Sequence, residues 1–76
     1  MLVSELIREL EKLDGNLPVI RAGYEGGVDD VVDVSVVTIA KNANTQWYYG
    51  KHEIVDGYGY REDLSQYPQV SAVYIN

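Results

Sequence analysis

The chain has no cysteine and a single histidine, so its 76 residues must fold without a disulfide or a structural zinc site of the usual type. A chain this short buries only about 60% of the surface that it exposes when unfolded, and it has no room for a second core. The sequence therefore predicts one domain over residues 1–76. Because small domains without such cross-links are often stabilised by association, we expect a homo-oligomer.

Apolar residues recur with helical spacing near the N-terminus, which predicts an amphipathic helix over residues 4–14. Ser4 is placed to cap this helix, and Gly15 is placed to end it. The apolar positions are Leu2, Val3, Leu6, Ile7, Leu10 and Leu13. The opposite side is charged, so the apolar side is the one expected to pack on another element.

The remainder of the chain alternates between β-branched segments and turn residues, which is typical of short strands and loops. Strands are predicted over residues 17–22, 31–40 and 69–75, with one short strand or hairpin within 46–55. Loops are predicted over residues 23–30 and 56–68. This order predicts an α+β fold, in which the N-terminal helix packs on a small, mainly antiparallel sheet of three to four strands.

The formal net charge is −6, with twelve acidic residues against six basic ones. Direct nucleic-acid binding needs clustered lysine and arginine, and binding to anionic membrane surfaces needs positive charge. No apolar run approaches the roughly 20 residues of a membrane span, and the first residues lack the pattern of a secretory signal. We therefore expect a cytoplasmic protein with neither nucleic acid nor membrane as a partner.

The aromatic residues are seven tyrosines and one tryptophan, with no phenylalanine, and most of them lie beside glycines in predicted loops. Because a buried tyrosine hydroxyl needs a partner, this choice suggests rings that keep one end in water. Tyrosine with glycine and asparagine is also the composition of evolved binding surfaces. The alternative is that tyrosines fill the sheet edges and glycines the turns. The predicted ligand-binding residues are Tyr24, Trp47, Tyr48, Tyr49, His52, Tyr58, Tyr60 and Arg61.

Arg61 follows two of these tyrosines, Tyr58 and Tyr60. Tyrosine rings beside a guanidinium suit a nucleobase and its phosphate. The sequence thus favours a small nucleotide-like ligand, bound without a cofactor. The simpler alternative is a surface arginine that happens to lie near tyrosines.

Catalysis has little support in the sequence. His52 has no second histidine or cysteine to complete a transition-metal site, and no serine lies in a nucleophile motif. His52 with Asp29, Asp30 or Glu53 leaves acid–base catalysis as an open alternative. The prediction is a non-enzymatic protein without catalytic residues.

The middle of the chain is acidic, with no basic residue between Arg21 and Lys41. The acidic patch consists of Glu25, Asp29, Asp30 and Asp33. Three interpretations stay open: a solvated strand edge that discourages aggregation, a patch that faces a basic partner, and a site for a divalent cation. The second interpretation predicts an inhibitor that occupies a basic or DNA-binding surface of a host protein. The spacing does not match an EF-hand loop, and no metal site is predicted.

Three segments resemble a group of short accessory proteins of phages and prophages. They are the opening residues 3–19, with the pattern ELI followed by LPV, residues 23–30 (GYEGGVDD) and residues 47–53 (WYYGKHE). The resemblance covers most of the chain, but the group carries no assigned activity, so no residue role is transferred. It implies a small protein of the host-cell cytoplasm that acts by binding, including against host defence. A structural or assembly module, whose tyrosines make only the oligomer contact, is a further alternative.

Overall fold

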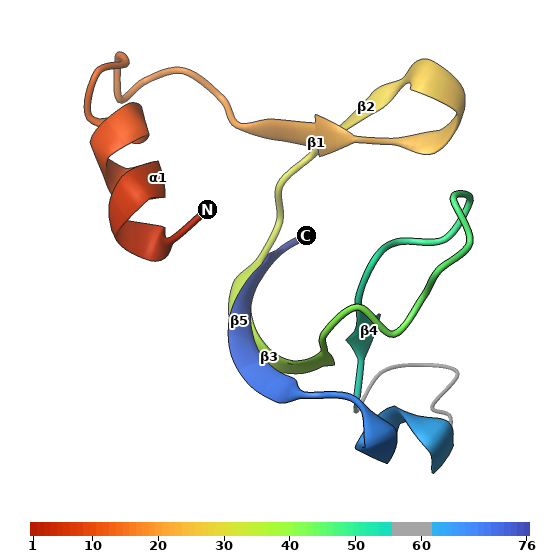
Figure 1. Cartoon of the computed structure of the whole chain (residues 1–76). Coiled ribbons are helices and arrows are strands. Elements are labelled where there is room, and N and C mark those ends of the chain that lie inside the picture. The colour runs from red at the N-terminus through yellow and green to blue at the C-terminus, as the bar shows by residue number, and fades with distance from the viewer. Residues whose placement is uncertain (56–61) are drawn as a thin grey trace. The chain divides into compact units, whose positions relative to one another are not determined.

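The computed structural model describes residues 1–55 and 62–76 (Figure 1). These residues form one α-helix and two small antiparallel sheets of two and three strands, so the predicted α+β class is confirmed. The chain divides into two compact units. The first unit contains Met1–Val34 with Ile75–Asn76, and the second contains Ser35–Tyr74. None of the helices in the described residues has both the length and the apolar character needed to cross a membrane.

The helix α1 spans Val3–Leu10 in the first unit. Its first free N–H group, that of Leu2, donates a hydrogen bond to the Glu5 Oε1 atom at 2.8 Å. A carboxylate at this place satisfies an N–H that has no partner inside the helix, and it interacts favourably with the helix dipole. Leu2 therefore occupies the capping position, and the prediction that Ser4 caps the helix is wrong.

The helix ends at Leu10, whereas the prediction ran to residue 14. Beyond this point the Leu13 N–H donates to the Leu10 carbonyl, three residues back, at 3.0 Å. The Asp14 side chain then accepts the Asn16 N–H at 2.9 Å. Such local side-chain bonds compete with helical ones. Gly15 consequently lies in a turn beyond the helix and does not end it, contrary to the prediction.

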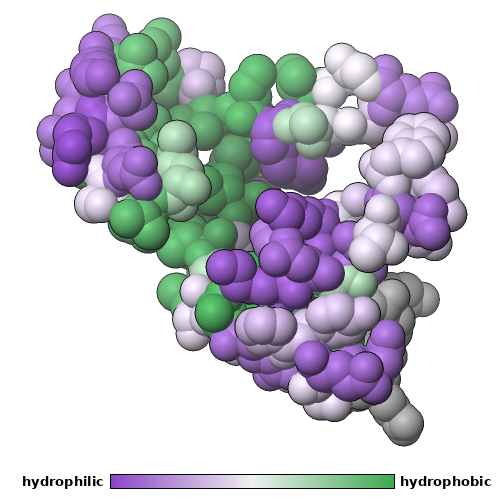
Figure 2. Space-filling model, viewed as in Figure 1, coloured by the Kyte–Doolittle hydropathy of each residue, from purple (hydrophilic) through white to green (hydrophobic). Residues whose placement is uncertain are grey.

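The apolar side of α1 stays largely exposed. Figure 2 shows hydrophilic residues over one side of the helix and hydrophobic residues over the other. About half or more of each of these apolar side chains is accessible: Leu2, Val3, Ile7 and Leu10. The amphipathic pattern is thus present, but the described residues leave its apolar side largely uncovered.

The two-stranded sheet is an antiparallel hairpin of β1 (Ile20–Ala22) and β2 (Val28–Asp30). Ile20 lies opposite Asp30 and Ala22 opposite Val28, and the short 3₁₀ turn η1 (Tyr24–Gly26) connects the strands. The predicted strand at 17–22 is therefore shorter than expected, and the predicted loop at 23–30 contains a second strand.

Two positions of this hairpin require glycine. A Cβ atom at Gly23 would lie 2.8 Å from the Asp29 Oδ2 atom and 3.2 Å from the Gly27 carbonyl oxygen. Gly26 has a φ of +82°, in the left-handed region that side chains disfavour. The glycines of the GYEGG segment thus fit a tight turn.

The three-stranded sheet has the order β4-β3-β5, with β3 (Val34–Ala40) in the centre. The short strand β4 (Glu53–Ile54) pairs antiparallel with the end of β3, where Ile54 lies opposite Ile39. On the other side β3 pairs with β5, Gln69–Ile75. The prediction of a strand at 69–75 is confirmed.

The strand predicted over residues 31–40 begins only at Val34. The Val31 N–H donates to the Val19 carbonyl at 3.3 Å, which extends the first hairpin rather than β3. The N–H groups of Val32 and Asp33 both donate to the Asn76 carbonyl, at 2.7 and 2.8 Å. Two consecutive residues of this segment thus face a single residue, Asn76, which interrupts the regular one-to-one pairing of a sheet. Regular pairing of β3 with β5 therefore begins at Val34.

The core of the second unit is small. Ala40, Ala43 and Leu64 are its buried residues, and Val55 and Tyr67 pack against them. Leu64 belongs to the 3₁₀ helix η2 (Glu62–Gln66), which lies within the segment that we predicted as a loop. The rest of that loop, residues 56–61, lies outside the described residues.

Candidate binding loop

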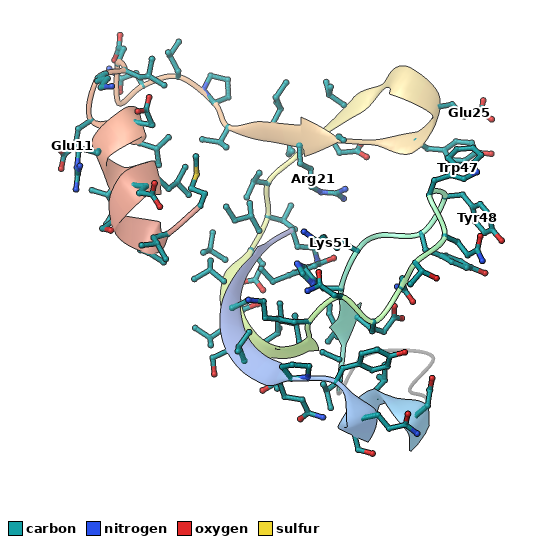
Figure 3. All side chains as sticks on the ribbon, viewed as in Figure 1. Glu11, Arg21, Glu25, Trp47, Tyr48 and Lys51 are labelled. Atoms are coloured by element: carbon teal, nitrogen blue, oxygen red, sulfur yellow. The ribbon has the colours of Figure 1, made fainter. Side chains whose placement is uncertain are left out.

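The connection between β3 and β4, residues 41–52, presents three consecutive aromatic side chains, and we call it the aromatic loop. Trp47 is 91% exposed, and Tyr48 and Tyr49 are each 61% exposed. Figure 3 shows Trp47 and Tyr48 at the end of the loop that is far from β4. Side chains of this size and polarity are the ones that dominate binding interfaces.

The three rings pack against one another. The Trp47 and Tyr48 ring centres lie 5.6 Å apart with the planes at 86°, an edge-to-face contact. The Tyr48 and Tyr49 centres lie 4.8 Å apart with the planes at 53°. Both separations are in the range that aromatic pairs favour, where each pair contributes about 0.5–1.5 kcal/mol beyond its burial. The rings therefore order one another while most of their surface stays in solvent.

Asn44 holds the two ends of the aromatic loop together. Its Nδ2 atom donates to the Gly50 carbonyl at 2.8 Å and to the Glu53 Oε2 atom at 2.6 Å. Its backbone N–H donates to the Lys51 carbonyl at 3.2 Å. Because Ala43 beside it is buried, this brace is anchored to the core of the unit.

His52 closes the base of the aromatic loop. Its Nδ1 atom accepts the backbone N–H of Asn42 at 2.9 Å. Asn42 has a φ of 56°, a left-handed conformation that asparagine tolerates better than most residues. A nitrogen that accepts an N–H carries no proton itself, so in the neutral imidazole this contact favours the tautomer with the proton on Nε2. His52 therefore has a structural part in the loop, whatever else it contacts.

The structure gathers half of the predicted ligand-binding residues into this loop. Trp47, Tyr48, Tyr49 and His52 belong to it, whereas Tyr24 lies in the hairpin of the first unit and is 87% exposed there. The other three, Tyr58, Tyr60 and Arg61, lie outside the described residues. The sequence reasoning missed the bracing role of Asn44 and of the Asn42–His52 contact, for which turn composition was the only signal.

The acidic patch lies on and beside the hairpin, with Glu25, Asp29, Asp30 and Asp33 all exposed. Arg21 lies opposite Asp29 in the strand register, yet none of the four forms a salt bridge with a described residue. Within residues 1–55 and 62–76 no cluster of three or more acidic, histidine or cysteine side chains could hold a metal ion. Among the described residues the patch thus presents uncompensated negative charge to solvent.

An open apolar groove of about 430 Å³ occurs elsewhere, in the first unit. It is lined by Leu10, Leu13, Asp14, Gly15, Leu17, Pro18, Val19 and Ile20. None of the predicted ligand-binding residues belongs to it, so the groove and the aromatic loop are separate features.

Comparisons with protein-family models, with curated proteins and with solved structures gave no match to this chain. The residues of the chain itself are therefore the basis for a function. The aromatic loop combines exposed, mutually packed rings with side-chain hydrogen bonds that hold the loop together.

Proposed function

We propose that this chain is a non-enzymatic binding module that engages a partner protein through the aromatic loop. The observation that carries the proposal is the exposure of Trp47, Tyr48 and Tyr49 side by side on a loop that Asn44 braces. Tryptophan and tyrosine are enriched among the interface residues whose truncation costs the most binding energy. Three such side chains in a row have no packing role in a core here, which leaves contact as their role.

The convexity of the loop supports a protein partner over a small molecule. Sites for small molecules are usually concave and cover most of the ligand. Rings that project into solvent, as Trp47 does, fit instead into a pocket or onto a flat surface of a larger partner. The brace supports the same proposal, because a loop that is ordered in advance loses less conformational entropy on binding.

Charge supports a partner with a basic surface. The chain has a formal net charge of −6, and the acidic patch adds local negative charge without an ion-pair partner among the described residues. Complementary charge steers encounter and raises association rates more than it raises affinity. In the phage-type setting that the resemblance implies, this describes an inhibitor of a basic host protein in the host cytoplasm.

A nucleotide-like ligand is the second candidate, favoured by one observation. The exposed rings lie in the same loop as Lys51, which is itself exposed. Ring faces accept nucleobases by stacking, and a nearby ammonium attracts phosphate. Binding measurements with cyclic nucleotides and ADP-ribose separate this candidate from a protein partner.

Trp47 is the single tryptophan of the chain, so fluorescence excited selectively at tryptophan, and not at the seven tyrosines, reports on the aromatic loop. We would capture host-cell proteins on the immobilised chain, purify what binds, and separately measure acrylamide quenching of Trp47 with cyclic nucleotides and ADP-ribose, which contain no tryptophan. A purified host protein that binds the wild-type chain and loses affinity for the loop variants supports the main proposal. Protection by a nucleotide at low concentration would favour the second candidate instead.

Alanine variants locate the contact. Trp47→Ala and Tyr48→Ala should weaken capture of the partner by about tenfold or more, the scale of a hot-spot residue. Tyr24→Ala is the control, because Tyr24 is a tyrosine outside the loop that is even more exposed than Tyr48, at 87% against 61%. Equal losses from Tyr24→Ala and Tyr48→Ala, or none from either, would contradict an interface centred on the aromatic loop.

A further inference from the structure

Strand β5 forms one edge of its sheet, because the strand order β4-β3-β5 gives it no second neighbour among the described residues. Its register follows from two flanking contacts. The Lys41 N–H donates to the Pro68 carbonyl at 2.7 Å, and the Asn76 N–H donates to the Asp33 carbonyl at 2.9 Å. Even-numbered residues of this segment therefore turn their backbone polar groups toward β3.

The odd-numbered residues of β5 turn theirs the other way, since successive residues of a strand alternate. Ser71 and Val73 consequently direct their N–H and C=O groups outward, away from β3. No backbone hydrogen bond of these groups to another described residue occurs outside the sheet ladder. β5 thus presents an open edge with hydrogen-bonding capacity.

This edge lacks the features that normally protect one. Natural edge strands carry charges, proline or bulges that prevent pairing with another chain. β5 has none of these between Gln69 and Ile75, and no charged side chain occurs from Leu64 to Asn76. Val70, Val73 and Tyr74 are each about two-fifths exposed along it. An unprotected edge of this length can pair with another strand through its free N–H and C=O groups.

We propose that β5 pairs antiparallel with β5 of a second copy of this chain, so that two three-stranded sheets join edge to edge. This inference is independent of the proposed function, because it uses none of the residues of the aromatic loop. It specifies the surface of the homo-oligomer that the sequence led us to expect.

The strand is complementary to itself. A two-fold axis at Ala72 places Ser71 opposite Val73 of the second copy, and these two outward-facing residues then exchange N–H···O=C bonds. On the other face of the sheet Val70 lies opposite Tyr74 of the second copy, an aromatic and β-branched pair that stabilises sheets. Ala72 lies on the axis, opposite Ala72 of the second copy, and the two small side chains leave room for the flanking Val70 and Tyr74 pairs.

Charge permits a second copy at this edge, although it opposes contact elsewhere. Two chains of net charge −6 repel each other over most of their surfaces. The uncharged run that contains β5 is where they can approach without bringing acidic side chains together. Two-fold pairing also satisfies the open β5 edges of both copies at once, as in the commonest closed oligomers.

Amide hydrogen exchange tests the pairing on the wild-type chain. The amides of Val70, Ala72 and Tyr74 face β3 and should be protected at any protein concentration. Those of Ser71 and Val73 should become protected only as concentration rises, by about tenfold or more when the dimer is populated. Exchange of Ser71 and Val73 that stays fast and independent of concentration would overturn the proposal.

Charge variants at Ser71 test the register. In the proposed pairing the two copies of residue 71 are diagonal neighbours, about 7–8 Å apart. Ser71→Glu and Ser71→Lys should each be monomeric by light scattering, while an equal mixture should form a heterodimer that native mass spectrometry resolves. The matched control is Gln66→Glu, which adds the same charge at an exposed site outside β5 and should dimerise as the wild type does.

Each outcome of the mixing experiment either supports or contradicts the pairing of β5 with β5. A dimer that survives Ser71→Glu, or a wild-type chain that stays monomeric at high concentration, contradicts the pairing. Circular dichroism checks that each variant is folded. If a variant is unfolded, hydrogen exchange on the wild-type chain still tests the pairing. If the dimer forms, it carries two copies of the aromatic loop.

Discussion

The side chain of Asn44 and the carboxylate of Glu53 lie 2.6 Å apart, joined by a hydrogen bond in which the asparagine Nδ2 donates. They are nine positions apart in sequence, and the three aromatic residues of the loop lie between them. The same Nδ2 atom also donates to the Gly50 carbonyl. One amide group thus fixes the geometry of a loop whose tip has no core to pack against.

Asn44→Asp should therefore loosen the aromatic loop. The replacement removes the donor and sets a second carboxylate against Glu53 and against a carbonyl oxygen, which should cost about 1–3 kcal/mol. Urea unfolding measures the loss, and acrylamide quenching measures the freedom of Trp47. Asn16→Asp is the matched control, since it makes the same change at an exposed turn. Equal stability of the two variants would show that Asn44 is not a brace.

Leu64→Ala should destabilise the second unit severely. Leu64 is fully buried in a core with few members, and truncation of a buried leucine typically costs about 2–5 kcal/mol. Chains of this size have little stability to lose, so the variant should be largely unfolded by circular dichroism at room temperature. Leu13→Ala, at an exposed leucine, should change the free energy of unfolding much less.

Gly23→Ala and Gly15→Ala should have opposite effects. At Gly23 a Cβ atom meets the Asp29 carboxylate, which must rotate away, and the Gly27 carbonyl at 3.2 Å, which must shift slightly, so the variant should lose about 0.5–1 kcal/mol. At Gly15 nothing lies within 4 Å, and alanine should be neutral or stabilise the chain by about 0.4–1 kcal/mol. Thermal unfolding compares them. Adding Asp29→Ala to Gly23→Ala should restore part of the loss, because it removes the closer contact.

The tautomer of His52 can be read directly. Since Nδ1 accepts the Asn42 N–H, the neutral ring should carry its proton on Nε2. Long-range nitrogen–proton NMR spectra at about pH 8, where an ordinary histidine is neutral, distinguish the two tautomers. His52→Ala should shift the Asn42 amide resonance most among those of the loop. A proton on Nδ1 would rule out the contact.

The elements with strong local patterns were predicted well, and those that depend on distant partners were not. The run of β-branched and aromatic residues in 69–75 was enough to place β5, because such residues favour strands whatever their burial. β2 was missed because Asp29 and Asp30 disfavour strands, and the register with β1 overrides that preference. The helix was found, but it ends at Leu10 with Glu11 as its C-cap, four residues before Gly15.

In the candidate site, too, residues that are neighbours in sequence were predicted, and contacts between distant residues were not. Trp47, Tyr48 and Tyr49 are adjacent in sequence, so any fold keeps them together, and composition alone identified them. Asn44 and Glu53 meet only because β3 and β4 pair, which no local pattern shows. Of the other predicted binding residues, Tyr24 belongs to the first unit, and Tyr58, Tyr60 and Arg61 lie outside the described residues, so the wider surface stays a prediction.

Helix α1 is eight residues long, and isolated helices below about 12–15 residues are marginal in water. With its apolar side uncovered, the segment is held in its helical form by little besides its own first-turn contacts. The coil–helix equilibrium of this segment is therefore set by whatever comes to rest on that side. A molecule that binds to the apolar side of α1 would stabilise the helical form. The ellipticity of the chain at 222 nm would then measure the fraction of chains with that side occupied.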